Sequence, residues 1–265
     1  MSTPYLTESE LSDAIAMLPP CPLGTQPRLV RDADIDPIVA LTNLAYQDAV
    51  WFKHPSIHDR TSAADARDQS AQGNPSSTYI CIDWPTASEC EERGLPLPPP
   101  TEGSLVETDS GTGGLGSSGG PIALAINLHR DAWSGPGALM ISLLAVHPRL
   151  HGRGLAKYIM ALSVQISRIV ACRERQSPRL VIEVVSVQSH LFDIYGKMGF
   201  EIVGKRTWDE FGVDPDMFTV ECHLVLMQRQ LEPLVLLDED HAQDQEEREQ
   251  IELDEGANLT MTVQA

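Results

Sequence analysis

Two glycines set one residue apart, Gly152 and Gly154, follow an apolar segment that stops at Pro148. Glycine has no Cβ, so a ligand can approach its backbone closely. The N–H groups at the start of a helix have no partner within the helix, and the helix dipole adds positive potential there. Arg149 and Arg153 contribute positive charge to the same turn. The spacing therefore predicts a site for a phosphate or pyrophosphate, and the alternative is a turn that uses glycine for packing alone.

Two other phosphate-binding motifs do not explain this turn. A P-loop carries a lysine followed by Ser or Thr after its second glycine, and the sequence has no such run. Gly111, Gly113 and Gly116 match the glycine pattern of a dinucleotide-binding loop. These glycines follow no predicted strand and open no predicted helix, so we interpret the match as accidental.

The glycine turn joins a predicted strand to a predicted helix. Residues 138–146 are apolar except for Ser142, and a strand without polar alternation is typical of the centre of a sheet. After Gly154, apolar residues recur at helical spacing as far as Arg173 and Arg175, whose charges suit the negative end of a helix dipole. We therefore expect the anion site at the junction of a central strand and an amphipathic helix.

The remaining segments show helix and strand patterns in turn. β-Branched residues favour a strand over 179–185, and Gly199 ends an amphipathic helix over 188–198. Further strands are expected over 28–31, 78–84, 121–128, 200–205 and 217–227, and further helices over 36–50 and 62–72. This order predicts an α+β (or α/β) fold, with a central mixed sheet of about six to seven strands flanked by helices on both faces.

The chain divides into three parts by composition. Residues 1–26 contain several prolines and are expected to form a loosely attached N-terminal arm, with a short helix near 7–17. Residues 27–230 form the predicted folded domain, interrupted at about 86–119 by an insertion rich in Pro, Gly and Ser. Such a segment buries too little apolar surface to offset the entropy of ordering it, so we expect it to be disordered. Residues 231–265 form an acidic C-terminal tail.

The composition narrows the class of protein. The 265 residues carry a formal net charge of -19, which argues against a surface that binds nucleic acid. The five cysteines are widely spaced and form no Cys-x-x-Cys motif, which argues against a disulfide framework or a zinc site. The sequence shows neither a signal peptide nor a run of about 18 apolar residues. We therefore expect a cytoplasmic protein, in a reducing compartment, that binds neither a membrane nor a metal.

Two motifs, in this order, carry a resemblance to a known family. Arg149-x-x-Gly152-x-Gly154, placed after the apolar strand, resembles the acetyl-CoA motif of the GCN5-related N-acetyltransferase (GNAT) superfamily. Further along the chain, Tyr195-x-x-x-Gly199-Phe200 is similar to the family's second signature, which lies at the end of a helix. The order of helices and strands also fits, and the resemblance covers roughly residues 28–230 without the insertion.

The resemblance implies an N-acetyltransferase that transfers an acetyl group from acetyl-CoA, as co-substrate, to a primary amine by direct attack in a ternary complex. In the family, the strand before the first motif splays from its neighbour, and the pantetheine arm lies in the gap. The residues that the resemblance assigns to acetyl-CoA are Leu144, Ala145 and Val146 in the strand, Arg149, His151, Gly152, Arg153, Gly154, Leu155, Ala156 and Lys157 in the turn and helix start, and Gln188, where the family often has Asn.

The resemblance also bears on proton transfer. Tyr195 matches the tyrosine that protonates the leaving thiolate in the family, and the alternative is a packing role, since Tyr195 lies on the apolar stripe of its helix. The general base stays open. Many relatives carry Glu or Asp on the splayed strand, at about the position of Ser142. Glu183, Glu221 and His223 are candidates on predicted strands, and a route relayed by water is an equal alternative.

The acceptor is expected to be a small-molecule amine, and a homodimer is compatible with the resemblance. Acidic residues over 209–216 lie in a loop that often lines the acceptor side in the family, where they can attract a cationic substrate. One alternative is a protein acetyltransferase that acts on lysine or on an N-terminus. Another is a non-catalytic CoA-binding domain whose acceptor site has decayed.

Overall fold

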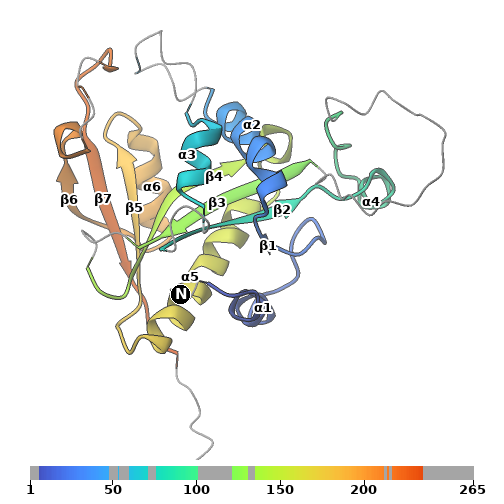
Figure 1. The fold of residues 1–265 in the computed structure, drawn as a ribbon, viewed down its shortest axis with the longest axis horizontal. Coiled ribbons are helices and arrows are strands. Elements are labelled where there is room, and N and C mark those ends of the chain that lie inside the picture. Colours follow the sequence, from blue (N-terminus) through green and yellow to red (C-terminus); the bar gives the residue numbers. More distant parts are fainter. Residues whose placement is uncertain are drawn as a thin grey trace, which may run out of the picture. The chain divides into compact units, whose positions relative to one another are not determined.

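A computed structural model of the chain describes residues 6–47, 53, 60–70, 76–100, 121–130, 135–211, 214 and 217–234. The chain separates into two units, Met1–Pro233 and Leu234–Ala265, and every element named below belongs to the first. In that unit seven strands form one sheet in the order β1-β2-β3-β4-β5-β7-β6 (Figure 1). The insertion residues 101–120 and most of the acidic tail lie outside the described residues.

The sheet is mixed, because β4 and β5 run parallel while every other neighbouring pair is antiparallel. The predicted central strand and the β-branched strand have the bounds expected from the sequence, whereas the last strand begins later than the predicted 217. The strands are β1 (Arg28–Leu29), β2 (Ser77–Asp83), β3 (Ile122–His129), β4 (Ala138–Val146), β5 (Arg179–Val185), β6 (Glu201–Arg206) and β7 (Leu224–Gln230).

Local signals in the sequence define the starts of three helices, α1, α3 and α4. Thr7, Ser62 and Thr86 each accept a hydrogen bond from the third residue of the following helix, and the acidic residue at that position caps in return. The helices are α1 (Glu8–Ala16), α2 (Ile35–Ala45), α3 (Ala63–Asp68), α4 (Ala87–Arg93), α5 (Leu155–Arg173) and α6 (Ser189–Lys197), and 3-10 turns cover η1 (Asp32–Asp34), η4 (Pro148–Leu150) and η5 (Trp208–Phe211).

Helices cover both faces of the sheet, as predicted (Figure 1). On one face, α1, α5 and α6 pack on the larger apolar cluster, which includes Leu11 and Ile159 from the helices and Ile80 from β2. On the other face, α2 packs Ile38 and Leu41 against a smaller cluster of strand residues. α5 has the length and apolar composition of a membrane-spanning helix, yet most of it is buried, which is typical of a core helix.

The strand β4 stays paired with β3 but loses its pairing with β5 partway along its length. It pairs with β5 only from Ala138 to Ile141, although both strands continue beyond this point. A register shift opposite Asn127 and Leu128 of β3 marks a β-bulge at Ser142, between the paired residues Ile141 and Leu143. Bulges bend a strand and increase its local twist, so the bulge accounts for the divergence of β4 from β5.

The N-terminal segment departs from the expected loose arm. Leu6, Leu11, Ala14 and Leu23 are buried and belong to the larger apolar cluster. Arg173 at the end of α5 donates to Glu10 of α1 at 2.5 Å. The prolines of this segment are compatible with close packing, because its apolar residues recur on one face of a capped helix.

The predicted insertion also begins later than expected. Residues 86–100 are ordered, since α4 follows Thr86 and buries Cys90 in the larger cluster. The indole N–H of Trp84 donates to the carbonyl of Pro96 at 3.0 Å, which ties the segment beyond α4 to the core. Within residues 86–100, a capping box, a buried side chain and the hydrogen bond to Pro96 therefore outweigh the composition that favoured disorder.

Candidate active site

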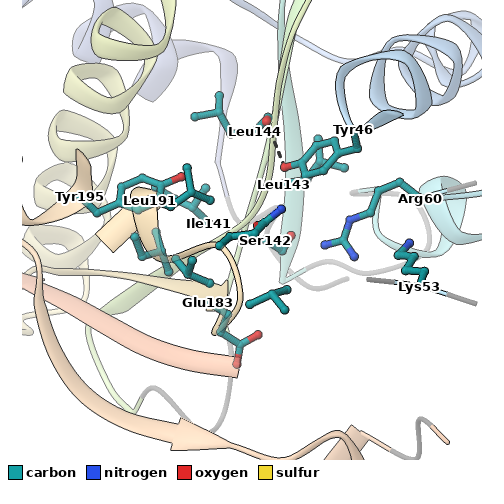
Figure 2. A pocket seen from close by; sticks show the side chains of 14 residues that line it. Tyr46, Lys53, Arg60, Ile141, Ser142, Leu143, Leu144, Glu183, Leu191 and Tyr195 are labelled. Atoms are coloured by element: carbon teal, nitrogen blue, oxygen red, sulfur yellow. Dashed lines mark hydrogen bonds between the residues drawn. The ribbon is translucent and has the colours of Figure 1, made fainter. Parts of the chain in front are cut away.

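The divergence of β4 from β5 opens a cleft between the two strands. We call it the β4–β5 cleft. Figure 2 shows its lining side chains, which come from both strands, from α6 and from the residues that follow α2. Its lining residues are Tyr46, Lys53, Arg60, Ile141, Ser142, Leu143, Leu144, Ile182, Glu183, Val184, Val185, Gln188, Leu191 and Tyr195.

A second cavity adjoins the cleft on the face that carries α3. We call it the outer cavity. The two spaces share five lining residues, namely Arg60, Ser142, Leu143, Glu183 and Val185. The outer cavity is completed by Thr61, Asp65, Gln69, His129, Met140, Arg206, Trp208 and Leu224. The site therefore spans the sheet from the α6 face to the α3 face, so two molecules can reach it from opposite sides.

The edge of β4 facing the cleft carries unpaired backbone groups. In an antiparallel ladder, alternate residues direct their N–H and C=O groups toward the partner strand, and the residues between them direct theirs away. His147 N–H donates to Ala123 O at 3.0 Å, so Ala145, two residues before, also faces β3. Leu144 and Val146 therefore direct their polar groups away from β3. The backbone groups of Ala145 are engaged by β3, contrary to expectation.

Side chains already contact the carbonyl groups of this edge. The hydroxyl of Tyr46 donates to Leu144 O at 3.1 Å (Figure 2). The ring Nε2 of His151 lies 3.2 Å from Val146 O. The two carbonyls are thus covered, while the N–H groups of Leu144 and Val146 point toward the cleft side as donors.

The turn before α5 has the open backbone expected of an anion cradle. Gly152 and Gly154 have φ angles of 77° and 80°, a region that favours glycine, and a Cβ at either residue would meet nothing within 4 Å. Gly154 is also the N-cap of α5, and no side chain caps the first N–H groups of the helix. The positive φ angles are enough to explain why glycine stands at these two positions, whether or not a ligand binds. The case for an anion therefore rests on the exposed N–H groups and on the nearby positive charge.

The basic residues of the turn are exposed to solvent. Arg149, Arg153 and Lys157 are all exposed, and the Arg149 guanidinium lies 6.0 Å from the ring centroid of Trp84. Arg149 N–H donates to Nδ1 of His147 at 3.2 Å. Burial, and then the charge of Arg149, lowers the pKa of His147, which favours the neutral ring that accepts this bond. The residues present therefore fit the diphosphate of acetyl-CoA.

Three other residues expected to contact acetyl-CoA differ in how accessible they are to a ligand. The side chain of Leu155 is buried in the core, so only its backbone remains for a ligand. Ala156 is half-buried in the first turn of α5. Gln188 is the N-cap of α6, makes no side-chain cap bond, and lines the β4–β5 cleft. Its amide is therefore placed to contact a molecule in the cleft.

Tyr195 of α6 lines the same cleft from the opposite side to Tyr46 (Figure 2). The ring is half-buried and packs edge-on against Phe200, with centroids 5.8 Å apart. Burial, followed by the influence of Tyr46, raises the pKa of Tyr195 to about 12. The side chain is therefore a protonated phenol near neutral pH, and the packing role and the proton-donor role are compatible.

Among the candidate bases, Glu183 lines both the cleft and the outer cavity. Arg206, whose side chain is only 9% exposed, donates to Glu183 Oε1 at 2.8 Å. This guanidinium holds the carboxylate at the junction of the two spaces. Figure 2 shows the Glu183 side chain on β5, below Ser142 of β4.

The other candidate bases are less suitably placed. Ser142 lines the cleft, but its hydroxyl donates to Asn127 Oδ1 at 2.5 Å. Glu221 and His223 precede β7 instead of lying on it, and neither lines the cleft or the outer cavity. The backbone N–H of His223 donates to Ser186 at 3.1 Å, which gives the residue a structural contact.

Three residues of the site were not anticipated from the sequence. Tyr46, Lys53 and Arg60 come from segments that look like ordinary helix end and loop, and all three line the cleft. Lys53 forms an isolated antiparallel bridge with Phe218, which brings Lys53 beside the residues before β7. No local motif marks these residues, since their role depends on contacts distant in sequence.

The acidic loop expected to line the acceptor side takes little part in the described site. Trp208 lines the outer cavity, whereas Asp209, Glu210 and Asp214 do not. Glu210 instead accepts hydrogen bonds from the backbone and the hydroxyl of Thr207, at 3.1 and 3.2 Å.

Several solved structures resemble this chain. One is described as a phosphinothricin N-acetyltransferase, with 12% identity, coverage of 78% of this chain and 98% of that chain, and a TM-score of 0.48. Another is the ribosomal-protein-S18-alanine N-acetyltransferase from Escherichia coli, with 9% identity, coverage of 81% and 97%, and a TM-score of 0.47. A third is an acetyltransferase from Salmonella typhimurium with its cofactor acetyl-CoA, with 15% identity, coverage of 81% and 98%, and a TM-score of 0.45.

No family model matches the chain, and no curated protein matches it. The three structural likenesses have low identity and TM-scores below 0.5, so we derive neither an activity nor an acceptor from them. The fold instead follows from the strand order, the bulge and the divergence of β4 from β5. With helices on both faces of this opened mixed sheet, the chain has the fold expected of the GNAT superfamily.

Proposed function

We propose that the protein is an acetyl-CoA-dependent N-acetyltransferase that acts on a primary amine of a small molecule. One observation carries the proposal, namely that the β4–β5 cleft crosses the sheet, with an anion cradle beside one face and a charged cavity at the other. Such a two-sided site suits a ternary complex, in which the thioester and the amine meet within the sheet. Holding both reactants in one geometry can lower the barrier by several kcal/mol.

Acetyl-CoA would bind along the cleft on the side of α5 and α6. The N–H groups that follow Gly152 and Gly154 would hold the diphosphate, with Arg149, Arg153 and Lys157 adding charge. The edge of β4 at Leu144 and Val146, and the amide of Gln188, would contact the pantetheine arm. This assignment uses the polar groups that the fold leaves open and omits the backbone of Ala145.

Polarisation of the thioester carbonyl would fall to an N–H group of the same edge. The N–H groups of Leu144 and Val146 face away from β3, and a fixed donor stabilises the oxyanion that forms as the amine attacks. These backbone donors are held in place by the strand before the reaction begins, so no free energy is spent on orienting them as the oxyanion forms.

Proton transfer would use one residue from each side of the cleft. An amine must lose a proton to attack, and Glu183 lies at the junction where an acceptor in the outer cavity would meet the cleft. The C–N bond then forms, the C–S bond breaks, and the departing thiolate takes a proton from the Tyr195 hydroxyl. Solvent returns the proton to Tyr195, while Glu183 releases the amine proton to water.

A thiol-release assay tests the function. Acetyl-CoA is offered with a panel of small amines, amino acids, polyamines and aminoglycosides, and separately with lysine-containing and N-terminal peptides. Turnover with free amines is expected, and turnover with peptides alone would favour the protein acetyltransferase. Tight CoA binding without any turnover would favour a non-catalytic CoA-binding domain.

The variant Glu183→Gln tests the proton acceptor. It keeps the size of the side chain and a hydrogen bond with Arg206, so the fold is expected to survive. The rate of amine acetylation should fall by about 100-fold near neutral pH and recover as the pH rises and the amine deprotonates without help. A parallel loss at every pH would argue against a role in proton transfer.

A further inference from the structure

Charged side chains of both signs surround the β4–β5 cleft and the outer cavity. Lys53, Arg60 and Arg206 provide cations, and Asp65 and Glu183 provide carboxylates. From this arrangement we infer that the acceptor carries an acidic group beside its amine, such as a carboxylate, and that Arg60 binds this group. The inference rests on the proposed function and specifies the class of its acceptor.

Both carboxylates already have partners within the protein. Asp65 accepts hydrogen bonds from the backbone N–H and the hydroxyl of Ser62, at 3.0 and 2.7 Å, as part of the capping box of α3. Glu183 accepts from Arg206 at 2.8 Å. The negative charge of the site is thus largely engaged, and Arg206 is engaged with Glu183.

Arg60 differs from Arg206 in this respect. Within the part of the chain that the structure describes, the guanidinium of Arg60 forms no ion pair, and the residue is exposed. It lies 5.4 Å from the ring centroid of Tyr46 and lines both spaces. Its donors are therefore open to a ligand at the junction where acetyl transfer would occur.

Hydrogen bonds hold the backbone N–H groups of Arg60 and Thr61, which places the Arg60 side chain beside the cleft. The side-chain carbonyl of Asn43 in α2 accepts from the N–H groups of Arg60 and Thr61, at 2.7 and 3.1 Å. A cation–π contact with Tyr46 favours this position of the guanidinium, whose fork of N–H groups matches a carboxylate or another oxyanion. Figure 2 shows Arg60 and Lys53 on one wall of the cleft and Glu183 on another.

An acceptor with both charges would suit these two walls. Its acidic group would face Arg60 and Lys53, and its amine would face Glu183 in the sheet. The chain as a whole has a net charge of -19, so the whole molecule repels anions. A local group of cations at the site therefore points to a specific anionic ligand. The acidic loop that suggested a cationic acceptor lines neither space through Asp209, Glu210 or Asp214.

Steady-state kinetics with matched acceptors test the inference. The series contains ω-amino acids of increasing length and α-amino acids, each compared with its carboxamide, together with aminoalkyl phosphonates and sulfonates. We expect kcat/KM for an anionic acceptor to exceed that of its uncharged analogue by at least about tenfold. The phosphonate and sulfonate arms identify which oxyanion the site prefers.

Variants then assign the effect to Arg60. Arg60→Gln should raise KM for the anionic acceptor about tenfold, leave the carboxamide unchanged and leave KM for acetyl-CoA unchanged, whereas Arg60→Lys should restore part of the loss. Arg67→Gln is the matched control, because Arg67 is an exposed residue of α3 that lines neither space. Equal or faster turnover of carboxamides would overturn the inference and leave the proposed function intact.

A binding measurement separates the inference from catalysis. Calorimetric titration with N-acetylated amino acids, and with their carboxamides, reports on the anion site without turnover. Binding that needs both the carboxylate and Arg60, in a protein without turnover, would support the anion site and reject the proposed function. Carboxylate binding that is indifferent to Arg60→Gln would reject the inference whatever the turnover.

Discussion

The side chain of Tyr195 is half-buried and projects from α6 into the β4–β5 cleft. Burial raises its pKa to about 12, because the phenolate would lose solvation there. A group with a raised pKa stays protonated up to that pH, so Tyr195 remains a proton donor throughout the neutral range. An alkaline loss of activity below about pH 11 would therefore originate elsewhere.

Replacing Tyr195 by Phe separates its chemical role from its packing role. The ring contact with Phe200 is retained and the donor is lost. We expect kcat to fall about 100-fold, with the Kd of acetyl-CoA changed less than about twofold. Steady-state kinetics and calorimetry measure the two quantities. Tyr158→Phe, a buried tyrosine of α5 outside the cleft, is the control, and an equal loss there would contradict the assignment.

The two glycines of the cradle serve backbone geometry and ligand access together. Gly154→Ala should destabilise the protein by about 1 kcal/mol, because the φ of 80° is strained for a residue with a Cβ. It should also weaken acetyl-CoA binding. Gly196→Ala is the matched control, since this glycine lies within α6 in open space, and we expect it to stabilise by about 0.5 kcal/mol. Urea unfolding measures both, and equal effects would count against the strain.

At the scale of elements, the bulge in β4 determines where the site lies. Parallel pairing holds β4 to β5 as far as Ile141, and beyond the bulge at Ser142 the strands separate. The freed edge, α5 with its open N-terminus and α6 with Tyr195 all adjoin this separation. The place where the two strands separate, and with it the position of the site, therefore depends on one extra residue in β4.

The helix α1 is an integral part of the same face as α5. Leu11→Ala removes a side chain that is 2% exposed in the larger cluster, and we expect the free energy of unfolding to fall by about 3 kcal/mol. Met17→Ala, at a side chain that is 48% exposed, should change it by less than about 0.5 kcal/mol. Urea denaturation followed by circular dichroism distinguishes the two. Similar small effects would restore the expectation of a loosely attached arm.

At the scale of the whole molecule, buried acids make stability depend on pH. Burial raises the pKa of the Cys81 thiol from 9.0 to about 12, and burial raises that of Tyr79 from 10.0 to about 12. Below pH 9 both groups are protonated in the folded and in the unfolded state, so their titration does not reduce the free energy of unfolding. Above pH 9 the unfolded thiol ionises while the folded thiol does not, so stability falls as pH rises, first from Cys81 and above pH 10 from Tyr79 also.

The slope of this dependence is measurable. Each group should lower the free energy of unfolding by about 1.4 kcal/mol per pH unit within its window. Urea midpoints from pH 7 to 10 test it, with Cys81→Ala as the comparison. The variant will be less stable at pH 7, but its stability should decline less steeply between pH 9 and 10. An unchanged slope would show that another group titrates there.

Local regularities in the sequence account for most of the elements. The unbroken apolar run defined β4, β-branched residues defined β5, and the glycine turn with its following periodicity located the start of α5. Capping boxes mark the starts of α1 and α4, although α1 was expected in a loosely attached arm and α4 falls within the predicted insertion. Burial of Leu11 and Cys90 depends on partners distant in sequence, so composition alone could not reveal it.

The sequence by itself determined the glycine turn before α5 and the place of Tyr195 near the end of α6, because a turn and a helix end are encoded by consecutive residues. Only the tertiary structure decided which β4 groups remain open, since that depends on the register with β3 and on the divergence from β5. It also decided the composition of the opposite wall. Tyr46, Arg60 and Glu183 belong to separate segments of the chain and line one cleft only in the folded protein, so no local pattern in the sequence predicts their arrangement.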